Sequence, residues 1–298
     1  RGGFGQNTEV VFECEDIDGT VLAWFDDCWK SLGDDEANAA RLEVYEERWE
    51  PPLRSPRTQL YSQAIEDDEG YFAEYASHWD SFVAQLAEAD LYWGTKKGWD
   101  FPITGETDSW LETISLGQRV ARRDDWSTFS KEDAHILLGR GRYGQLGNMR
   151  GAGLANNVFR ASTAANLRTR RTIRKALQPC IDAQDEQFPH AACDFIETVN
   201  SLDGFGGAIA TRFLALARPD VAISVNAGSS SRLAALTGLP ESSLSKAPSG
   251  RGHSYFDLLH WFRQQEWYSN PQPRNAREKL YANARAALFD ALVYDWGD

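Results

Sequence analysis

Residues 202–226 read LDGFGGAIATRFLALARPDVAISVN, and this stretch decides the fold. Gly204 and Gly206 predict a tight turn, because glycine adopts backbone conformations that are closed to other residues. The apolar run over residues 207–217 predicts a helix, and Pro219 ends it because proline cannot continue a helix. The sequence therefore predicts a glycine hairpin that opens directly into an apolar helix.

The flanking residues complete a larger unit. An apolar pattern over residues 194–201 predicts a second helix before the hairpin. After the proline, residues 221–225 favour an extended segment that ends at the polar Asn226. The predicted order is helix, hairpin, helix, extended segment and polar residue.

The hairpin has the chemistry of an anion site. Gly204 and Gly206, which flank Phe205, let the main chain approach a ligand closely. The amides of Gly206, Gly207 and Ala208 would stand unpaired at a helix N-terminus, which attracts anions through its free N–H groups and the helix dipole. A DNA phosphate would suit this site. The alternative is an ordinary tight turn between two helices.

This unit, with Pro219 and Asn226 at the family's spacing, resembles the helix-hairpin-helix DNA glycosylase superfamily with the Gly/Pro/Asp loop (HhH-GPD). Members of that family cut the bond between a base and its sugar. The resemblance implies a mainly helical domain, duplex DNA with a flipped modified base as partner, and an enzyme that leaves an abasic site. A monovalent or divalent cation at the hairpin is a further expected partner.

Ala208 departs from the pattern of the bifunctional members, which carry a lysine there that forms a Schiff base with the sugar. Alanine cannot attack a sugar, so the resemblance implies a monofunctional glycosylase.

Asn226 departs more sharply, because the family's catalytic aspartate stands at this place. A carboxylate stabilises the positive charge that builds on the sugar, whereas an amide offers only its carbonyl dipole. Three explanations are open: an inactivating substitution, a natural asparagine that positions a water with help from another carboxylate, or a loss of catalysis with binding kept. Ser229 and Arg232 are further expected DNA contacts, although Arg232 stands one place after the family's arginine.

Charge is distributed unevenly along the chain, whose net charge is −13. Residues 1–138 carry 30 acidic and 12 basic side chains, whereas residues 139–181 carry nine basic side chains and no acidic one. Screening over about 8 Å in cells separates a basic groove from a distant acidic lobe. An acidic total is therefore compatible with DNA binding.

The basic segment begins with a glycine-rich stretch over residues 139–153, which predicts a flexible loop or a linker between halves. A basic helix is predicted over residues 162–177, and its Arg168, Arg170 and Arg171 are expected to contact phosphates. The alternative is a helix whose charged face is simply solvated.

The predicted fold class is mainly α (α+β). It comprises a small acidic N-terminal lobe over residues 1–138, with a strand over residues 8–15, and a helix-hairpin-helix domain over residues 139–298. Further helices are predicted over residues 71–89 and 276–296. An aromatic loop is predicted from Trp93 to Trp110, and a capping box at Ser130 predicts the start of another helix.

No metal site and no cofactor is predicted, because the four cysteines are far apart and form no CxxC pair. No run of about twenty apolar residues occurs, and the first residues lack the apolar core of a signal peptide, so we expect a cytoplasmic protein without a membrane span.

The leading functional hypothesis is a DNA glycosylase. Its acidic, aromatic N-terminal lobe would suit a base that carries a sugar adduct, because carboxylates and tryptophans line sugar sites. In this the chain resembles bacterial anti-phage glycosylases that attack glucosylated cytosines, so antiviral defence against phage DNA with glucosylated hydroxymethylcytosine is the expected role. The alternatives are a catalytically inactive DNA-binding module and a DNA-binding partner in a complex whose acidic lobe docks another protein. Tryptophans could stack on bases, but core packing must account for most of them.

Overall fold

The computed structural model describes residues 78–95, 101–105, 107–147, 153–241, 244 and 253–294. All of them lie in one compact unit that spans Glu69–Trp296, and the boundary predicted after residue 138 falls inside this unit. The strand predicted over residues 8–15 lies outside the described residues. Within these ranges the chain is helical and contains no β-strand, as expected for a mainly α fold.

The first helices are α5 (Trp79–Thr95), α6 (Trp110–Ala121), α7 (Lys131–Leu137), the 3-10 turn η2 (Gly141–Tyr143), α8 (Gly153–Arg160) and α9 (Ala164–Asp182). They are followed by α10 (Phe188–Asn200), α11 (Gly207–Ala217), α12 (Ser230–Thr237), α14 (His253–Arg263), α15 (Glu266–Ser269), α16 (Ala276–Leu288) and α17 (Asp290–Val293). No described helix has the length and apolar character needed to cross a membrane.

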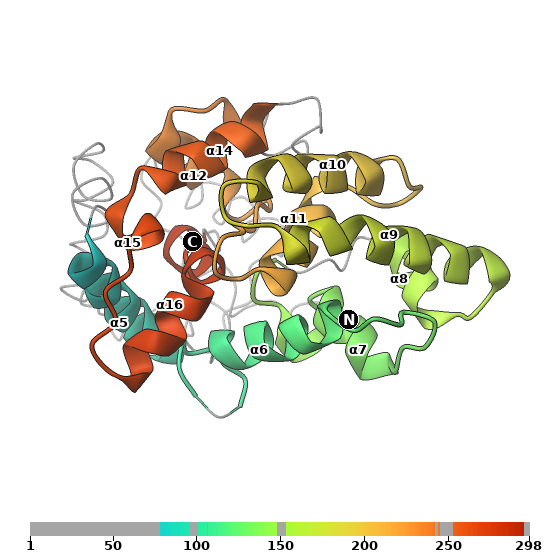
Figure 1. Ribbon diagram of the computed structural model, residues 1–298. Coiled ribbons are helices and arrows are strands. Elements are labelled where there is room, and N and C mark those ends of the chain that lie inside the picture. Colours follow the sequence, from blue (N-terminus) through green and yellow to red (C-terminus); the bar gives the residue numbers. More distant parts are fainter. Residues whose placement is uncertain are drawn as a thin grey trace, which may run out of the picture. The chain divides into compact units, whose positions relative to one another are not determined.

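Helix α11 occupies the centre of the unit (Figure 1). It contacts α6, α7, α9, α10 and α16, and of its side chains only Ala208 is more than slightly exposed. Its apolar sequence therefore has a direct cause, because a helix that is apolar on every side must be covered on every side. The helix that follows the hairpin is thus the core of the fold.

Several predicted helices are confirmed with shifted ends. The capping box at Ser130 is present, since its hydroxyl accepts from the Asp133 amide while the Asp133 carboxylate accepts from the Ser130 amide. The basic helix α9 begins after Thr163, whose side chain caps it, and continues to Asp182. The helix before the hairpin begins at Phe188 rather than at residue 194.

Two predicted boundaries are wrong. Trp93 belongs to α5, which continues to Thr95, into the first residues of the predicted loop. Trp93 is buried, and its indole donates to the Ala291 carbonyl at 3.0 Å. The final helix is broken at Phe289 into α16 and α17, and the Phe289 ring is stacked on Trp267 at 5.2 Å.

Most tryptophans of the described residues pack into the core. Those that are buried there are Trp79, Trp93, Trp110, Trp126 and Trp267. Trp267 lies between Phe82 and Phe289 in two stacked contacts. These five indoles are therefore committed to packing and cannot also stack on bases.

Arg212 is the most heavily bonded side chain of α11, and it is completely buried. Its guanidinium donates to the carbonyl oxygens of Ile136, Leu137, Tyr143 and Gly147 at 2.8–3.0 Å. It also donates to the carbonyl oxygen of Gln145. Burial lowers the pKa of Arg212 to about 9, while nearby Asp290 works in the opposite direction. One cation therefore fastens the end of α7 and the following loop to the central helix.

The Arg212→Met variant tests this fastening. We expect it to lower the free energy of unfolding by about 3 kcal/mol or more, because buried carbonyls would be left without donors. Urea denaturation measures the loss. The matched control is Arg119→Met on the exposed face of α6, which should change stability by about 0.5 kcal/mol or less. Equal effects of the two substitutions would contradict the fastening role.

Candidate functional site

The predicted hairpin is present between α10 and α11. The Phe205 amide donates to the Leu202 carbonyl at 3.1 Å, and Gly204 has a φ of +78°, in the left-handed region that favours glycine. A Cβ atom at Gly204 would also lie 2.2 Å from Cβ of Leu154 in α8. Both the backbone angle and the close approach of α8 therefore require glycine here.

Gly206 starts α11 without a side-chain cap. Its carbonyl accepts from the amides of Ile209 and Ala210, so the amides of Gly207 and Ala208 precede the first intrahelical hydrogen bond. A Cβ atom at Gly206 would meet no atom within 4 Å. The space in front of this helix start is open among the described residues.

Phe205 does not have the exposure expected of a DNA contact. Its side chain is buried and packs against Phe159 of α8, with ring centroids 6.3 Å apart. The prediction for Phe205 is therefore corrected: this side chain anchors the hairpin to α8, and any contact with DNA would have to come from its main chain.

The segment before Asn226 has no regular secondary structure and pairs with no strand among the described residues. Side-chain hydroxyls supply the hydrogen bonds to its backbone that a neighbouring strand would otherwise supply. Tyr268 donates to the Val221 carbonyl at 2.5 Å, and Tyr255 donates to the Ile223 carbonyl at 2.9 Å. The Val225 amide donates to Thr211 Oγ1, and the Thr211 hydroxyl donates to the Val225 carbonyl, both at 3.1 Å. This backbone is therefore fixed by three helices.

The bonds of Thr211 place Asn226 near the hairpin. Thr211 stands four residues after Gly207, a rise of about 6 Å along α11. Because Thr211 binds Val225, residue 226 lies beside the N-terminal half of α11, the helix that the hairpin opens. The sequence separates these two parts of the predicted site by about twenty residues.

Asn226 is held on both ends of its amide and is only 6% exposed. Its Nδ2 donates to Asp290 Oδ1 at 3.1 Å, and its Oδ1 accepts from the Gly228 amide at 2.9 Å. The main-chain N–H of Asn226 donates to the Ser229 hydroxyl oxygen at 3.2 Å. The side chain is therefore fixed in one orientation.

Asp290 begins α17 and is completely buried. Burial raises the pKa of Asp290 to about 7, against the opposing effects of the Ser229 hydroxyl, the Asn226 amide and the Arg212 cation. Its Oδ2 has no hydrogen-bond partner among the described residues. Asn226 is thus backed by a carboxylate whose charge changes near neutral pH.

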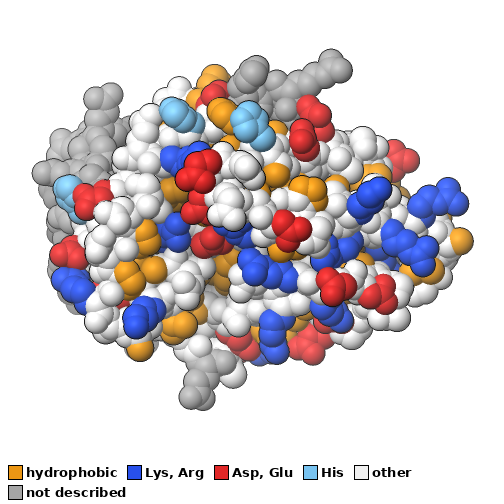
Figure 2. All heavy atoms as spheres, in the orientation of Figure 1, with side chains coloured by type: hydrophobic (Ala, Val, Ile, Leu, Met, Phe, Trp, Pro, Cys, Tyr) orange, Lys and Arg blue, Asp and Glu red, His pale blue; other side chains and the backbone are white. Residues whose placement is uncertain are grey.

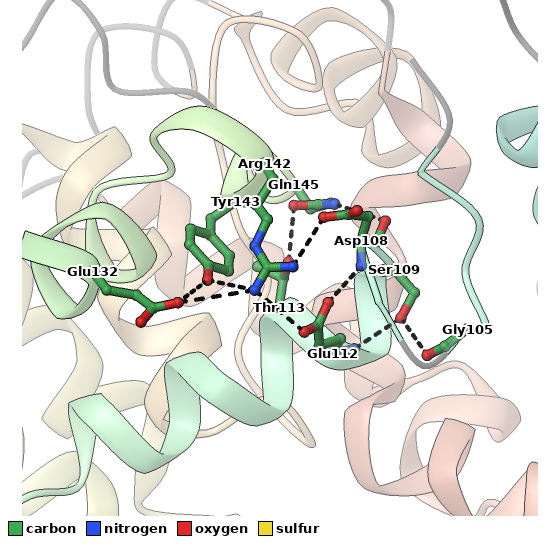
Figure 3. A network of polar contacts seen from close by, with 9 residues as sticks. All are labelled: Gly105, Asp108, Ser109, Glu112, Thr113, Glu132, Arg142, Tyr143 and Gln145. Carbon is green, nitrogen blue, oxygen red and sulfur yellow. Dashed lines mark hydrogen bonds and ion pairs between the residues drawn. The ribbon is translucent and has the colours of Figure 1, made fainter. Parts of the chain in front are cut away.

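The loop over residues 139–147 forms another wall of this site, and it is not the free basic loop that was predicted. Figure 3 shows Arg142 among three carboxylates: it donates to Asp108 Oδ1 at 3.2 Å, and its Nη2 lies 3.7 Å from Glu112 and 3.9 Å from Glu132. These ion pairs satisfy the charge of Arg142 within the protein. A phosphate is therefore not needed to balance it.

Gly147 lies directly against Asn226. A Cβ atom at Gly147 would lie 3.0 Å from Cβ of Asn226, and the φ of Gly147 is +92°. Its carbonyl is one of the acceptors of Arg212. The cation that fastens the loop therefore also sets the distance between the loop and residue 226.

Ser229 and Arg232 occupy different environments. Ser229 is completely buried beside Asn226 and Asp290, so it supports the site from within and is not exposed to DNA. Arg232 lies on α12 and is partly exposed, with interactions inside the protein.

The basic side chains of α9 divide into two groups. Arg168, Arg171 and Lys175 are exposed, and Figure 2 shows Lys and Arg side chains gathered where Figure 1 places α8 and α9. Arg170 is buried, and its guanidinium donates to the carbonyls of Ser127, Val158 and Ala161. The structure corrects the prediction that Arg170 contacts phosphate, because the side chain is buried and each of its three nitrogens donates to a carbonyl inside the fold.

Two grooves, of about 520 and 310 Å³, follow α6, and Leu116 and Arg119 line both. Neither is lined by Asn226 or Asp290. No group of three or more His, Cys, Asp or Glu side chains suited to a metal ion occurs in the described part of the chain. The cation expected at the hairpin stays a prediction.

Sequence reasoning missed Asp290 and the structural role of Arg212. Each is a lone charge within an apolar run, in AALFDALV for residues 286–293 and in GAIATRFLALA for residues 207–217. Charged residues are almost never fully buried unless they are paired or hydrogen-bonded. This pattern is the signal that could have found both.

No family model matches this chain, and no curated protein and no solved structure is significantly similar to it. The candidate site therefore stands on the geometry of these residues.

The titration of Asp290 gives a prediction for stability. Its pKa is near 3.8 when unfolded and about 7 when folded, so between these values the folded chain binds more protons. This contribution to stability is present at about pH 4 and is lost as the pH rises to about 7. We expect Asp290→Asn to remove this loss, on the order of a few kcal/mol.

Urea denaturation at pH 5 and pH 8 measures this difference. The matched control is Asp194→Asn, at an exposed position of α10, which should keep the pH dependence of the unchanged chain. An identical pH dependence in Asp290→Asn and in the unchanged chain would rule out a raised pKa at Asp290.

Proposed function

We propose that the chain is a monofunctional DNA glycosylase that binds a DNA phosphate at the hairpin and releases a base beside Asn226. One observation supports the proposal: the Thr211 bonds hold the residue before Asn226 against the N-terminal half of α11, the helix that begins with the glycine hairpin. An anion site and a polar position for the sugar thereby come within reach of one nucleotide.

The reaction consumes one water. The bond between C1′ of the sugar and the base nitrogen breaks, and the base leaves with the electron pair. Water adds to C1′, and its proton balances the charge of the base. Positive charge on the sugar rises in the transition state, so a fixed negative dipole or charge nearby lowers the barrier.

Two features define the expected product. Ala208 stands where a nucleophilic lysine would be needed, so no Schiff base forms at that position. The strand should therefore keep its backbone and carry an intact abasic site.

Phosphate contacts are assigned to the exposed face of α9. Arg168 and Arg171 are exposed, and Leu154 at the start of the preceding α8 packs against the hairpin at Gly204. This supports a basic surface that continues from the hairpin.

The substrate class rests on the sequence. The acidic, aromatic composition of residues 1–138 favours a base with a polar or sugar adduct, and glucosylated hydroxymethylcytosine in phage DNA is the proposed example. Antiviral defence would be the corresponding role.

A second candidate is a DNA-binding module without catalysis. The observation in its favour is the burial of Asn226, whose Oδ1 accepts from the Gly228 amide as in many turns that contain asparagine. Measurement of base release separates the two candidates.

Gly206→Val tests the phosphate site. We expect a folded protein, because a side chain here meets no atom within 4 Å and the φ of −150° is allowed to any residue. Affinity for DNA should fall about tenfold or more, because the side chain covers the amides that face the phosphate. Fluorescence anisotropy measures binding, and unchanged affinity in the folded variant would make the hairpin purely structural.

The double variant Arg168→Gln/Arg171→Gln tests the basic face. Each lost phosphate contact should weaken binding to all sequences alike and reduce the slope of log K against log salt by about one. The control is Arg119→Gln/Lys279→Gln, which removes two exposed charges on α6 and α16. Equal slopes for the two doubles would exclude α9 as the phosphate-binding face.

Base release is the direct test of the activity. Normal, damaged and phage-modified duplex DNA is incubated with the chain and with Asn226→Asp, and free bases are identified by mass spectrometry. We expect release from modified DNA, with a rate that Asn226→Asp raises far more than the affinity. Borohydride should trap no covalent complex. No release by either protein from any of these DNAs would leave the binding module.

A further inference from the structure

Asp290 lies directly behind the catalytic position of the proposed function. Its Oδ1 accepts from Asn226 Nδ2 at 3.1 Å, and its side chain is completely buried. A buried carboxylate costs free energy, and a neutral side chain of similar shape would hold the turn at lower cost. Packing alone therefore does not explain an acid at this place.

The nearest buried cation does not form an ion pair with Asp290 in the described part of the chain. Arg212 directs its guanidinium at main-chain carbonyls, and it acts on Asp290 through the electric field. The direct partner of the carboxylate is instead the amide of Asn226. The charge of Asp290 is thus aimed at residue 226.

An amide that donates to a carboxylate has nearly the shape of two carboxyl groups that share one proton. Two carboxyls about 3 Å apart cannot both ionise at neutral pH, so they also hold one negative charge. The pair at residues 226 and 290 therefore carries one negative charge with Asn226 as it stands once Asp290 has ionised, above about pH 7, and would carry one with an aspartate in place of Asn226.

We propose that residues 226 and 290 form one acid–amide unit that keeps a single negative charge beside the reacting sugar, with Asp290 as a positioning residue for base excision. The unit rests on the function proposed above. Asp290 fixes Nδ2 of Asn226 toward itself, so Oδ1 is the end of the amide turned away from the carboxylate. Donation to a charged acceptor also increases the negative charge on Oδ1.

The charged, titratable and polar groups around the carboxylate, among the described residues, come from three elements. Arg212 faces it from α11, and Tyr294 follows α17 and interacts with it electrostatically. The third is the turn before α12, which contributes the uncharged Ser229 hydroxyl. Burial raises the pKa of Tyr294 to about 12 and lowers that of Arg212 only to about 9, so both keep their ordinary charge near neutral pH. A change of charge here near pH 7 is therefore that of Asp290.

A charge exchange tests the unit with four chains. They are the unchanged chain, Asn226→Asp, Asp290→Asn, and the exchanged double variant Asn226→Asp/Asp290→Asn. The unchanged and exchanged chains each keep one carboxylate and one amide, whereas the singles have two acids or none. Asp194→Asn, on the surface of α10, is the control for loss of a carboxylate elsewhere.

Base release is measured on duplex DNA that contains glucosylated hydroxymethylcytosine. We expect Asp290→Asn to lower the rate by about 10²-fold, as when a charge-stabilising group is removed from an active site. The exchanged chain should regain at least the rate of the unchanged chain, because its carboxylate stands at residue 226. In the unchanged chain the rate should rise with pH through about 7, and Asp290→Asn should lose this rise.

The melting temperature tests the unit without any substrate. At pH 8, Asn226→Asp should lower it more when residue 290 is Asp than when residue 290 is Asn, since only the first pair brings two acids together. At pH 5 the difference between the two backgrounds should shrink, because the proton that two buried acids must share is then taken up at a smaller free-energy cost.

Each outcome decides the proposal. Full activity of Asp290→Asn, or failure of the exchanged chain to regain it while remaining folded, overturns the positioning role. If none of the four chains releases a base, the proposed function fails and the role in excision fails with it. The melting temperatures then decide the pair alone: equal effects of Asn226→Asp in both backgrounds overturn the one-charge unit, and the predicted inequality upholds it.

Discussion

The buried guanidinium of Arg212 is the interaction on which the rest of this structure depends. It stands on the central helix α11 and binds carbonyls from the end of α7 and from the loop over residues 139–147. A cation without hydrogen bonds could not be kept there, and these carbonyls could not be buried without donors. The buried guanidinium and the buried carbonyls therefore require each other, and the Arg212 side chain fixes the course of the loop.

Hydrogen bonds to buried backbone groups also position Asn226. The segment before it has no partner strand among the described residues, so the hydroxyls of Thr211, Tyr255 and Tyr268 bind its backbone. Gly147, whose carbonyl is bound by Arg212, closes against the other side of the residue. A helix, two tyrosines and a loop thus converge on one amide, and this rigidity would suit a group that must meet a developing charge without reorganisation.

Electrostatics inside the unit separates two kinds of basic residue. One kind donates hydrogen bonds to carboxylates and carbonyls of the protein, as Arg142, Arg170 and Arg212 do. The other kind is exposed on α9 and comprises Arg168 and Arg171. A basic run in the sequence is therefore not by itself a basic surface. Asp290 is the matching case for acids, since its burial raises its pKa and directs its charge toward Asn226.

The sequence by itself determined the helical class, the hairpin with its two glycines and the capping box at Ser130, because each depends on neighbouring residues in the chain. Only the tertiary structure decided which charges are buried and what they meet. Asp290 and Asn226 are 64 residues apart in sequence, and Arg212 is separated from its acceptors by 65–76 residues. Contacts at such separations arise from packing around α11, so patterns among neighbouring residues in the sequence cannot predict them.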